Sequence, residues 1–341
     1  MTSDTAAHRI DATQLRPEDF AWGRHAAQHP VAAGVRRLVG AASSHDRTSP
    51  LDEAARLALQ HDALAGAALW ISGPGTAELT GFALVRGQGA DGDGTSAGPL
   101  EVDLVVDPER RRAGSGRALA DAVLAAYPSA ELSAWSHGNH PGAAVLAERC
   151  GLQRQRDLWV MRRAMTGHGS ELPDLPELPL PPHEPTGVAV DLRTFRPGHD
   201  EDALLEVNAA AFVHHPEQGR LTRADLDQRM GEDWFDPAGL FLAVDADGTV
   251  LGFHWTKVHP ETQDAPAHGE VYVVGVSPTA QGIGLGRLLT LAGLRHLADS
   301  GLGEVILYVE SDNAAAVATY QGLGFTHADE DTHVRYHRAA A

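Results

Sequence analysis

A strand-like segment followed by a glycine-rich loop occurs twice in this chain of 341 residues, and this repeat limits the possible folds most. Gly114 and Gly116 in residues 101–117 correspond to Gly284 and Gly286 in residues 271–287, and each pair is 170 positions apart. In each copy, β-branched residues precede a proline-containing turn, and an apolar helical stretch follows the glycines. The sequence therefore predicts an α/β fold with two tandem copies of one unit. Each unit is expected to contain a mixed, mainly antiparallel sheet flanked by helices.

A proline-rich segment separates the two copies. Residues 171–187 contain six prolines, which are disfavoured inside helices and central strands. The chain length also fits about two domains at roughly 150 residues each. We therefore predict an N-terminal domain over residues 1–165, an extended linker over 166–187 and a C-terminal domain over 188–341.

Composition argues against several classes of function. The net charge of −19 disfavours nucleic acid and anionic membranes as partners, whereas it would help to collect a cationic amine. Cys150 is the single cysteine, and the 19 histidines, including His214 and His215, show no compact metal-ligand spacing. No apolar run approaches the ~20 residues that span a bilayer, and the first residues do not resemble a secretory signal. The sequence predicts a cytoplasmic monomer without a metal.

The loop over residues 281–286 is suited to a phosphate or pyrophosphate. Glycines between a strand and a helix present backbone N–H groups without a Cβ that would hold the ligand away. A P-loop would need a lysine after its last glycine, but the only lysine of the chain is Lys257. A dinucleotide fold would need a third glycine where Leu289 stands.

The pattern that remains is Arg/Gln-x-x-Gly-x-Gly, which begins at Arg111 in the first copy and at Gln281 in the second. It resembles the motif with which GCN5-related N-acetyltransferases (GNATs) bind the pyrophosphate of acetyl-CoA. The resemblance implies that acetyl-CoA is the co-substrate and that each copy holds a nucleotide pocket. The residues implied are Leu104, Val105, Val106, Arg112, Ala113, Gly114, Ser115, Gly116 and Arg117 in the first copy, and Val274, Gly275, Val276, Gln281, Gly282, Ile283, Gly284, Leu285, Gly286, Arg287 and Asn313 in the second.

Further segments resemble the mycothiol synthase family, whose members carry two GNAT domains in one chain. The resemblance covers essentially the whole chain and is sharper in the second half, at residues 215–219, 252–257, 269–276, 307–313 and 319–325. It implies acetylation of the cysteinyl amine of cysteinyl-glucosaminyl-inositol, which gives mycothiol. Two alternatives stay open: acetylation of another amine, such as a peptide N-terminus or an aminoglycoside, and a non-catalytic acyl-CoA sensor.

Acetyl transfer to an amine needs a base for the ammonium proton and an acid for the leaving thiolate. Glu270 begins the motif strand and is the candidate base, although a solvated glutamate at a strand end is the simpler interpretation without the repeat. Tyr320 lies seven residues after Asn313, about two helical turns along, and therefore on the same face. The resemblance implies that Tyr320 is the general acid. An aromatic side chain packed in the core is the alternative.

The first copy departs from this pattern. An offset of 170 places Leu100 opposite Glu270, and an offset of 173 places Ala147 opposite Tyr320. Neither residue can transfer a proton. We therefore expect the first copy to bind a nucleotide without performing the chemistry.

The acceptor implied by the resemblance is an amine with a thiol and many hydroxyls, and it would need charged and hydrogen-bonding partners. The positions that resemble the family's acceptor site, in addition to Glu270, are Glu53, Glu217, Lys257 and Tyr308. Glu53 fits an ordinary helix start equally well, because acidic residues are favoured in a first turn.

Overall fold

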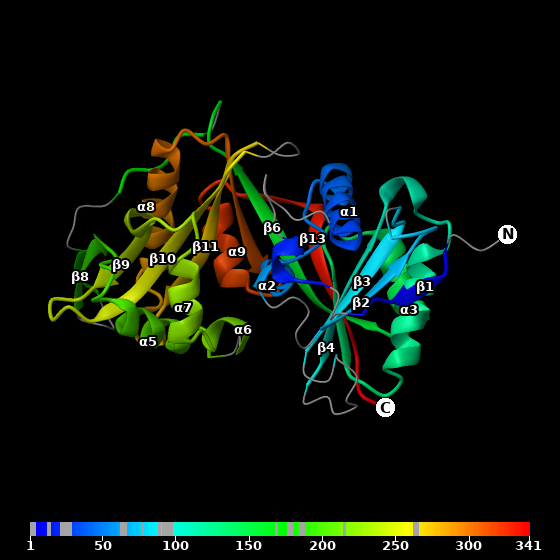
Figure 1. The fold of residues 1–341 in the computed structure, drawn as a ribbon. Helices are drawn as coiled ribbons and strands as arrows, with labels where there is room; N and C mark the ends of the chain where they lie inside the picture. The colour runs from blue at the N-terminus through cyan, green and yellow to red at the C-terminus, as the bar shows by residue number, and fades with distance from the viewer. Residues whose placement is uncertain are drawn as a thin grey trace. The chain divides into compact units, whose positions relative to one another are not determined.

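The structure is a computed structural model in which two compact units can be described. It describes residues 5–11, 15–20, 29–61, 67–76, 78–87, 90, 98–167, 170–175, 180–183, 188–213, 216–261 and 266–341. Unit 1 comprises Met1–Leu158 together with Ala328–Ala341, and unit 2 comprises Trp159–His327. Figure 1 draws both units and labels their elements where there is room.

Unit 1 has a sheet with helices on both faces. Its strand order is β1-β2-β3-β4-β5-β13, in which β4 and β5 are parallel and the other neighbouring strands are antiparallel. One apolar cluster joins α1 and α2 to one face, and another joins α3 to the opposite face. The strands are β1 (Ala7–Arg9), β2 (Ala67–Ser72), β3 (Gly81–Arg86), β4 (Leu100–Val106), β5 (Leu132–Ser136) and β13 (Thr326–Arg338); the helices are η2 (Pro17–Phe20), α1 (Pro30–Asp46), α2 (Glu53–His61), η3 (Pro108–Arg110), α3 (Ser115–Ala126) and α4 (Pro141–Arg149).

Unit 2 repeats this plan. Its strand order is β6-β12-β11-β10-β9-β8-β7, and β11 and β12 form the parallel pair. Helix α8 packs on one face, whereas α5 and α7 contribute to the cluster on the other. The strands are β6 (Gln153–Ala164), β7 (Leu180–His183), β8 (Val188–Thr194), β9 (Leu240–Val244), β10 (Val250–His259), β11 (His268–Val276) and β12 (Glu304–Glu310); the helices are α5 (Glu201–Ala211), α6 (Pro216–Gly219), α7 (Arg223–Met230), η4 (Pro237–Gly239), η5 (Pro278–Ala280), α8 (Leu285–Asp299) and α9 (Ala314–Gln321).

The division into units differs from the linear domain boundaries that we predicted at residues 165 and 188. Strand β6 changes unit after Leu158, and β13 changes unit after His327. Residues Val334–Arg338 pair with β5, so the last strand of the chain belongs to the sheet of unit 1. The reason is that sheet membership depends on hydrogen-bonding partners and not on order along the chain.

Part of the predicted linker forms a strand. Leu180 and His183 of β7 pair with Val190 and Val188 of β8. Strand β7 lies at the edge of the sheet, where prolines are tolerated because one side of the strand needs no partner. Residues 168–169, 176–179 and 184–187 of the linker lie outside the described residues.

The parallel strand pair diverges in both units. Strand β11 pairs with β12 only from Gly269 to Val271, and β4 pairs with β5 only at Leu100 and Glu101. Within these fully described strands, the parallel pairing does not extend to the rest of β11 or β4. Each unit therefore has a strand with one backbone edge left open beside its glycine-rich loop.

Strand β11 also contains a β-bulge. Trp255 of β10 is opposite Val273 and the next residue, Thr256, is opposite Val271, so that Tyr272 is the extra residue. Strands β3 and β4 of unit 1 instead pair continuously from Gly81 to Arg86. A bulge adds one residue to one strand. The difference in residue number between equivalent positions of the two units therefore changes at Tyr272.

Among the residues that the structure describes, no helix combines the length and apolar character needed to cross a membrane.

Candidate active site

The open edge of β11 lies where we expect the thioester and pantetheine to bind. Val274, Gly275 and Val276 pair with β10 on one side and lie beyond the last pair with β12. Leu104 and Val106 occupy the same situation in unit 1, beyond the last pair with β5. Such an edge can donate and accept backbone hydrogen bonds with a ligand that lies between the two strands.

The loop of unit 2 places glycines where a ligand could approach the backbone. Gly282 and Gly284 have φ of 83° and 84°, a region that favours glycine, and Gly284 is the N-cap of α8. Gly286 has no such φ, and a Cβ at this position would have Val276 Cγ2 at 3.9 Å as its nearest neighbour. Neither the backbone nor the packing of the fold requires a glycine at 286. We infer that the space is kept for a ligand at the helix N-terminus.

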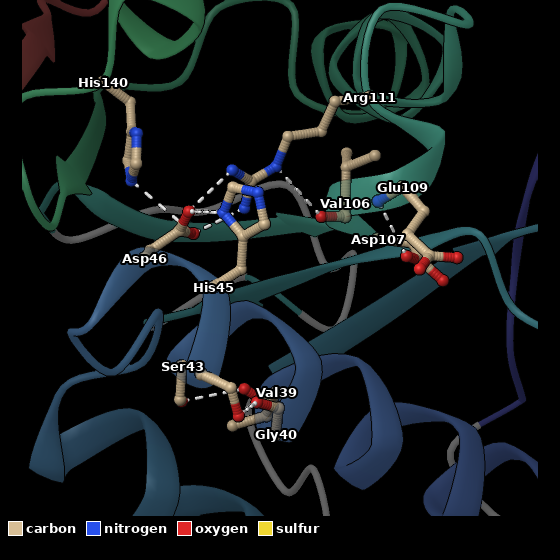
Figure 2. A network of polar contacts seen from close by, with 11 residues as sticks. Val39, Gly40, Ser43, His45, Asp46, Val106, Asp107, Glu109, Arg111 and His140 are labelled. Atoms are coloured by element: carbon tan, nitrogen blue, oxygen red, sulfur yellow. Dashed lines mark hydrogen bonds and ion pairs between the residues drawn. The ribbon is translucent and has the colours of Figure 1, made fainter. Parts of the chain in front are cut away.

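The loop of unit 1 has similar backbone angles and begins with Arg111 in place of Gln281. Figure 2 shows Arg111 pointing toward Asp46. Gly114 has φ of 103° and caps α3, while Arg112 adopts φ of 64° where unit 2 has Gly282. Arg111 Nη1 donates to Asp46 Oδ1 at 2.8 Å, and His45 lies 3.0 Å from the same carboxylate. Although burial opposes ionisation of Asp46, the hydrogen bonds from Arg111 and His45 lower its pKa. The first side chain of the motif is thereby fixed to the end of α1.

The side chains of several other loop residues contact the rest of their own unit. Leu285 is buried in the core, and the buried Ser115 Oγ lies 3.0 Å from Thr80 Oγ1. The guanidinium of Arg287 donates to Gly322 O at 3.2 Å, and the exposed Arg117 pairs with an aspartate one turn along α3. Leu285 and Ser115 can therefore reach a ligand through their backbone N–H groups, whereas the two arginines lie at the surface beside the loops.

Glu270 is buried at the last paired stretch of β11. It is 7% exposed, and its Oε2 lies 2.5 Å from His259 Nε2. The ring of His259 stacks on that of His268, with centroids 4.5 Å apart. The carboxylate is thus held on one oxygen, and it is not the solvated strand-end glutamate of the simpler interpretation.

Lys257 is opposite Glu270 on β10 and is 7% exposed. Its Nζ lies 4.3 Å from the ring centroid of Trp234 and 4.9 Å from that of Tyr272. Aromatic faces stabilise a cation by about 0.5–2 kcal/mol according to how dry the site is. Buried ammonium and carboxylate groups on adjacent strands form a site that can hold a polar, charged acceptor.

Tyr320 and Asn313 lie along α9, as the spacing predicts. The ring of Tyr320 packs edge-on against Phe325 at 5.9 Å, and burial raises the pKa of its hydroxyl to about 12. Asn313 is the N-cap of α9, and its Oδ1 accepts a hydrogen bond from the Ala316 N–H at 3.1 Å. Tyr320 therefore remains protonated at neutral pH, which a general acid requires.

The remaining acceptor candidates are distributed over different elements. Tyr308 on β12 is 42% exposed, and Glu53 is the first residue of α2 in unit 1. Glu217 belongs to the short α6, but its side chain is outside what the structure describes, and His214 and His215 lie outside the described residues.

Three residues near Glu270 were not predicted from the sequence. His259 is two residues after Lys257 on β10, so the period of two along a strand could have identified it. Trp234 and Tyr272 contact Lys257, but only the folded arrangement brings Trp234 to this lysine.

The predicted correspondence of Leu100 with Glu270 is wrong. Glu270 lies opposite Lys257 on the antiparallel neighbour and opposite Ile306 on the parallel neighbour. In unit 1, Glu101 lies opposite Arg86 and Ser133 on the corresponding strands. Because the bulge in β11 adds one residue, corresponding positions of the two units before the bulge differ by 169 and not by 170. Unit 1 therefore has a glutamate at the position of the candidate base.

Comparisons with known proteins agree on one family. The profile of the acetyltransferase (GNAT) family matches residues 203–325. A mycothiol acetyltransferase of Nocardioides sp. is 49% identical over 92% of this chain and 99% of its own length. Those of Geodermatophilus obscurus and Nocardia farcinica are each 48% identical and cover 86% and 88% of this chain, with 90% and 92% of their own lengths matched.

Solved structures support the tandem fold. The tandem GNAT protein from the clavulanic acid biosynthesis pathway has a TM-score of 0.65 and 21% identity, with 98% of each chain covered. A GCN5-related N-acetyltransferase from Sphaerobacter thermophilus has a TM-score of 0.62 and 23% identity, with 91% of this chain and 93% of its own covered. The predicted fold class, two tandem GNAT-type units, is confirmed.

Proposed function

The chain belongs to the mycothiol acetyltransferases, and from this membership we propose that unit 2 acetylates the cysteinyl amine of cysteinyl-glucosaminyl-inositol. The protein is an acyltransferase of mycothiol biosynthesis, and GNAT acetyltransferases use acetyl-CoA. The observation that carries the proposal is the buried Glu270 opposite Lys257, in the last paired stretch of the strand that leads to the glycine-rich loop.

Each step of the transfer has a candidate group in unit 2. The N–H groups at residues 282–286 would bind the pyrophosphate of acetyl-CoA, and the open edge at residues 274–276 would bond the pantetheine and polarise the thioester carbonyl. Glu270 would accept the proton of the amine, directly or through water, as the nitrogen forms its bond to the carbonyl carbon. Tyr320 would donate its proton to the sulfur as the carbon–sulfur bond breaks.

The acceptor is proposed to lie along Glu270, Lys257 and Tyr308, with Glu217 as a further contact. The buried charges of Glu270 and Lys257 support an acceptor with several hydrogen-bonding groups over an apolar one. Unit 1 is proposed to bind acetyl-CoA at residues 104–106 and 112–117 without turnover, because Ala147 stands where Tyr320 is expected.

The direct test is an acceptor comparison with the purified full chain. Acetyl-CoA is incubated with cysteinyl-glucosaminyl-inositol, an aminoglycoside or a peptide, and CoA formation is followed by chromatography because the first acceptor itself carries a thiol. We expect product with the cysteinyl acceptor in large excess over the others. Equal rates with all three, or no CoA formation, would contradict the proposal.

Replacement of Lys257 tests the acceptor site. Lys257→Met keeps the aliphatic stem between the two rings and removes the ammonium, so we expect the KM for the acceptor to rise at least ~10-fold while the KM for acetyl-CoA changes little. Steady-state kinetics with each substrate varied in turn gives both values. Equal weakening of both substrates, together with a lower melting temperature, would instead indicate a structural lysine.

Replacement of Tyr320 tests the general acid. Tyr320→Phe keeps the contact with Phe325 and removes the proton donor, so kcat should fall on the order of 10²-fold. Because burial raises the pKa of Tyr320 to about 12, the wild-type rate should show no loss of this acid up to about pH 11. A pH profile of kcat for both proteins checks this. An alkaline limb near pH 10 that disappears in Tyr320→Phe would show that the tyrosine titrates in its usual range.

A further inference from the structure

Unit 1 repeats the arrangement of charged residues around Glu270. Glu101 occupies the position of Glu270 by register, and Arg86 lies opposite Glu101 as Lys257 lies opposite Glu270. Two adjacent strands therefore present a carboxylate and a cation at the same places in both units. A constant offset of 170 conceals this relation, because the bulge at Tyr272 moves the first residues of β11 by one place.

The neighbouring parallel strand extends the correspondence to an aromatic residue. Ser133 is beside Glu101 as Ile306 is beside Glu270. Side chains two residues further along a strand lie on the same face, which places Trp135 in unit 1 at the position of Tyr308. Tyr308 is one of the proposed acceptor contacts, so unit 1 contains the carboxylate, the cation and the aromatic residue of such a site.

A side chain of unit 1 itself occupies this arrangement. Arg335 on β13 is opposite Trp135, and its guanidinium carbon lies 5.7 Å from the tryptophan ring centroid. Its Nη2 donates to Glu101 Oε1 at 2.8 Å, and its Nε donates to Ser133 Oγ at 2.7 Å. The side chain of Arg335 is 12% exposed, so the guanidinium is largely buried. Arg335 is thus a cation bonded to Glu101, the carboxylate at the position of Glu270. In unit 2, a bound amine would make the same contact with Glu270.

The surrounding charges favour a cation at this place. Arg86 donates a hydrogen bond to Asp103 at 3.0 Å and lies 3.5 Å from Asp52. The charge of Glu101 acts on both Arg86 and Asp103. Burial raises the pKa of Asp103 to about 7 despite the adjacent guanidinium of Arg86. Glu101, Asp103 and Asp52 thus lie near Arg86 and Arg335, and removal of Arg335 would take away a guanidinium that hydrogen-bonds Glu101.

We propose that unit 1 contains a second binding site for a small organic cation, built on Glu101, Ser133 and Trp135, and that Arg335 fills it as an internal substitute for the amine. This assignment rests on the proposed acceptor site around Glu270. It gives a second reason, beyond the absence of an acid at Ala147, why unit 1 does not acetylate: the place of the acceptor is taken by the chain itself.

The test is to open the site and add a guanidinium. In the full-length protein, Arg335→Ala should gain a saturable rise in melting temperature with millimolar methylguanidinium, matched for ionic strength with sodium chloride, and the wild type should not. Adding Glu101→Gln to Arg335→Ala should weaken this binding at least ~10-fold, because the charge-assisted hydrogen bond is lost.

Arg154→Ala is the matched control. The guanidinium of Arg154 donates to Asp157 through Nε and Nη2, each at 2.7 Å, so this variant removes a guanidinium from a different carboxylate of unit 1. An equal response of Arg154→Ala, or no response of a folded Arg335→Ala, would overturn the proposal. If Arg335→Ala does not fold, Arg335→Val favours the strand and still leaves the space of the guanidinium open, and absence of probe binding to that variant is equally decisive. These measurements involve no turnover, so a failure of Glu270 as the base would leave their outcome unchanged.

Discussion

Gly286→Val is expected to abolish acetyl transfer while leaving unit 2 folded. The Cβ would have its nearest neighbour 3.9 Å away at Val276, so the fold itself accommodates the side chain. The same side chain would stand at the N-terminus of α8, where the phosphate groups must approach the backbone N–H groups. We expect the affinity for acetyl-CoA at this site to fall at least ~10²-fold, because a close approach to the backbone is lost.

Calorimetric titration with acetyl-CoA and a turnover assay measure this effect. Gly142→Val is the control, since Gly142 is also the second residue of a helix and a Cβ there would meet nothing within 4 Å. Melting temperatures of both variants should stay within a few degrees of the wild type.

Gly116→Val makes the corresponding change in unit 1. Its Cβ would lie 3.3 Å from Val106 Cγ2, so this variant is expected to melt at a lower temperature than Gly286→Val. It should remove at most one bound acetyl-CoA per chain and keep most of the turnover. If a well-folded Gly116→Val were inactive while Gly286→Val still turned over, the assignment of the chemistry to unit 2 would be wrong.

Glu270→Gln is expected to lower kcat by about 10²-fold or more at neutral pH. The amide has the same shape as the carboxylate and can still accept a hydrogen bond from His259, so the surrounding contacts should remain. It cannot accept the proton of the attacking amine. The affinity for acetyl-CoA, measured by titration, should change little because the glycine-rich loop is untouched.

Turnover measured from acidic to alkaline pH gives a second test of Glu270. Glu304→Gln is the matched control: it makes the same charge change at the start of β12, where Glu304 pairs with Arg162 at 2.9 Å. Unchanged turnover of Glu270→Gln across the profile would remove Glu270 from this role.

Local sequence determined the two loops and the elements on either side of them. Glycines with positive φ at 114, 282 and 284, the strand before each loop and the helix after it depend on residues close together in the chain. The same holds for Asn313 and Tyr320, whose positions follow from the helical repeat. The prediction of a phosphate ligand therefore rests on local sequence alone.

Tertiary structure decided which residues of the two copies correspond. The bulge at Tyr272 exists only as a relation between β10 and β11, so a strand read alone does not show that Glu101 matches Glu270. The same limit applies to the last strand, which joins the sheet of unit 1 through its pairing with β5.

The surroundings of the charged groups were also decided by the fold. Trp234 reaches Lys257 from a separate segment, and Arg335 reaches Glu101 from the last strand of the chain. The order of residues fixes neighbours along a strand or helix, since those distances are set by backbone geometry. Contacts between distant segments depend on which strands pair and in which register, and a single residue added to one strand changes the register.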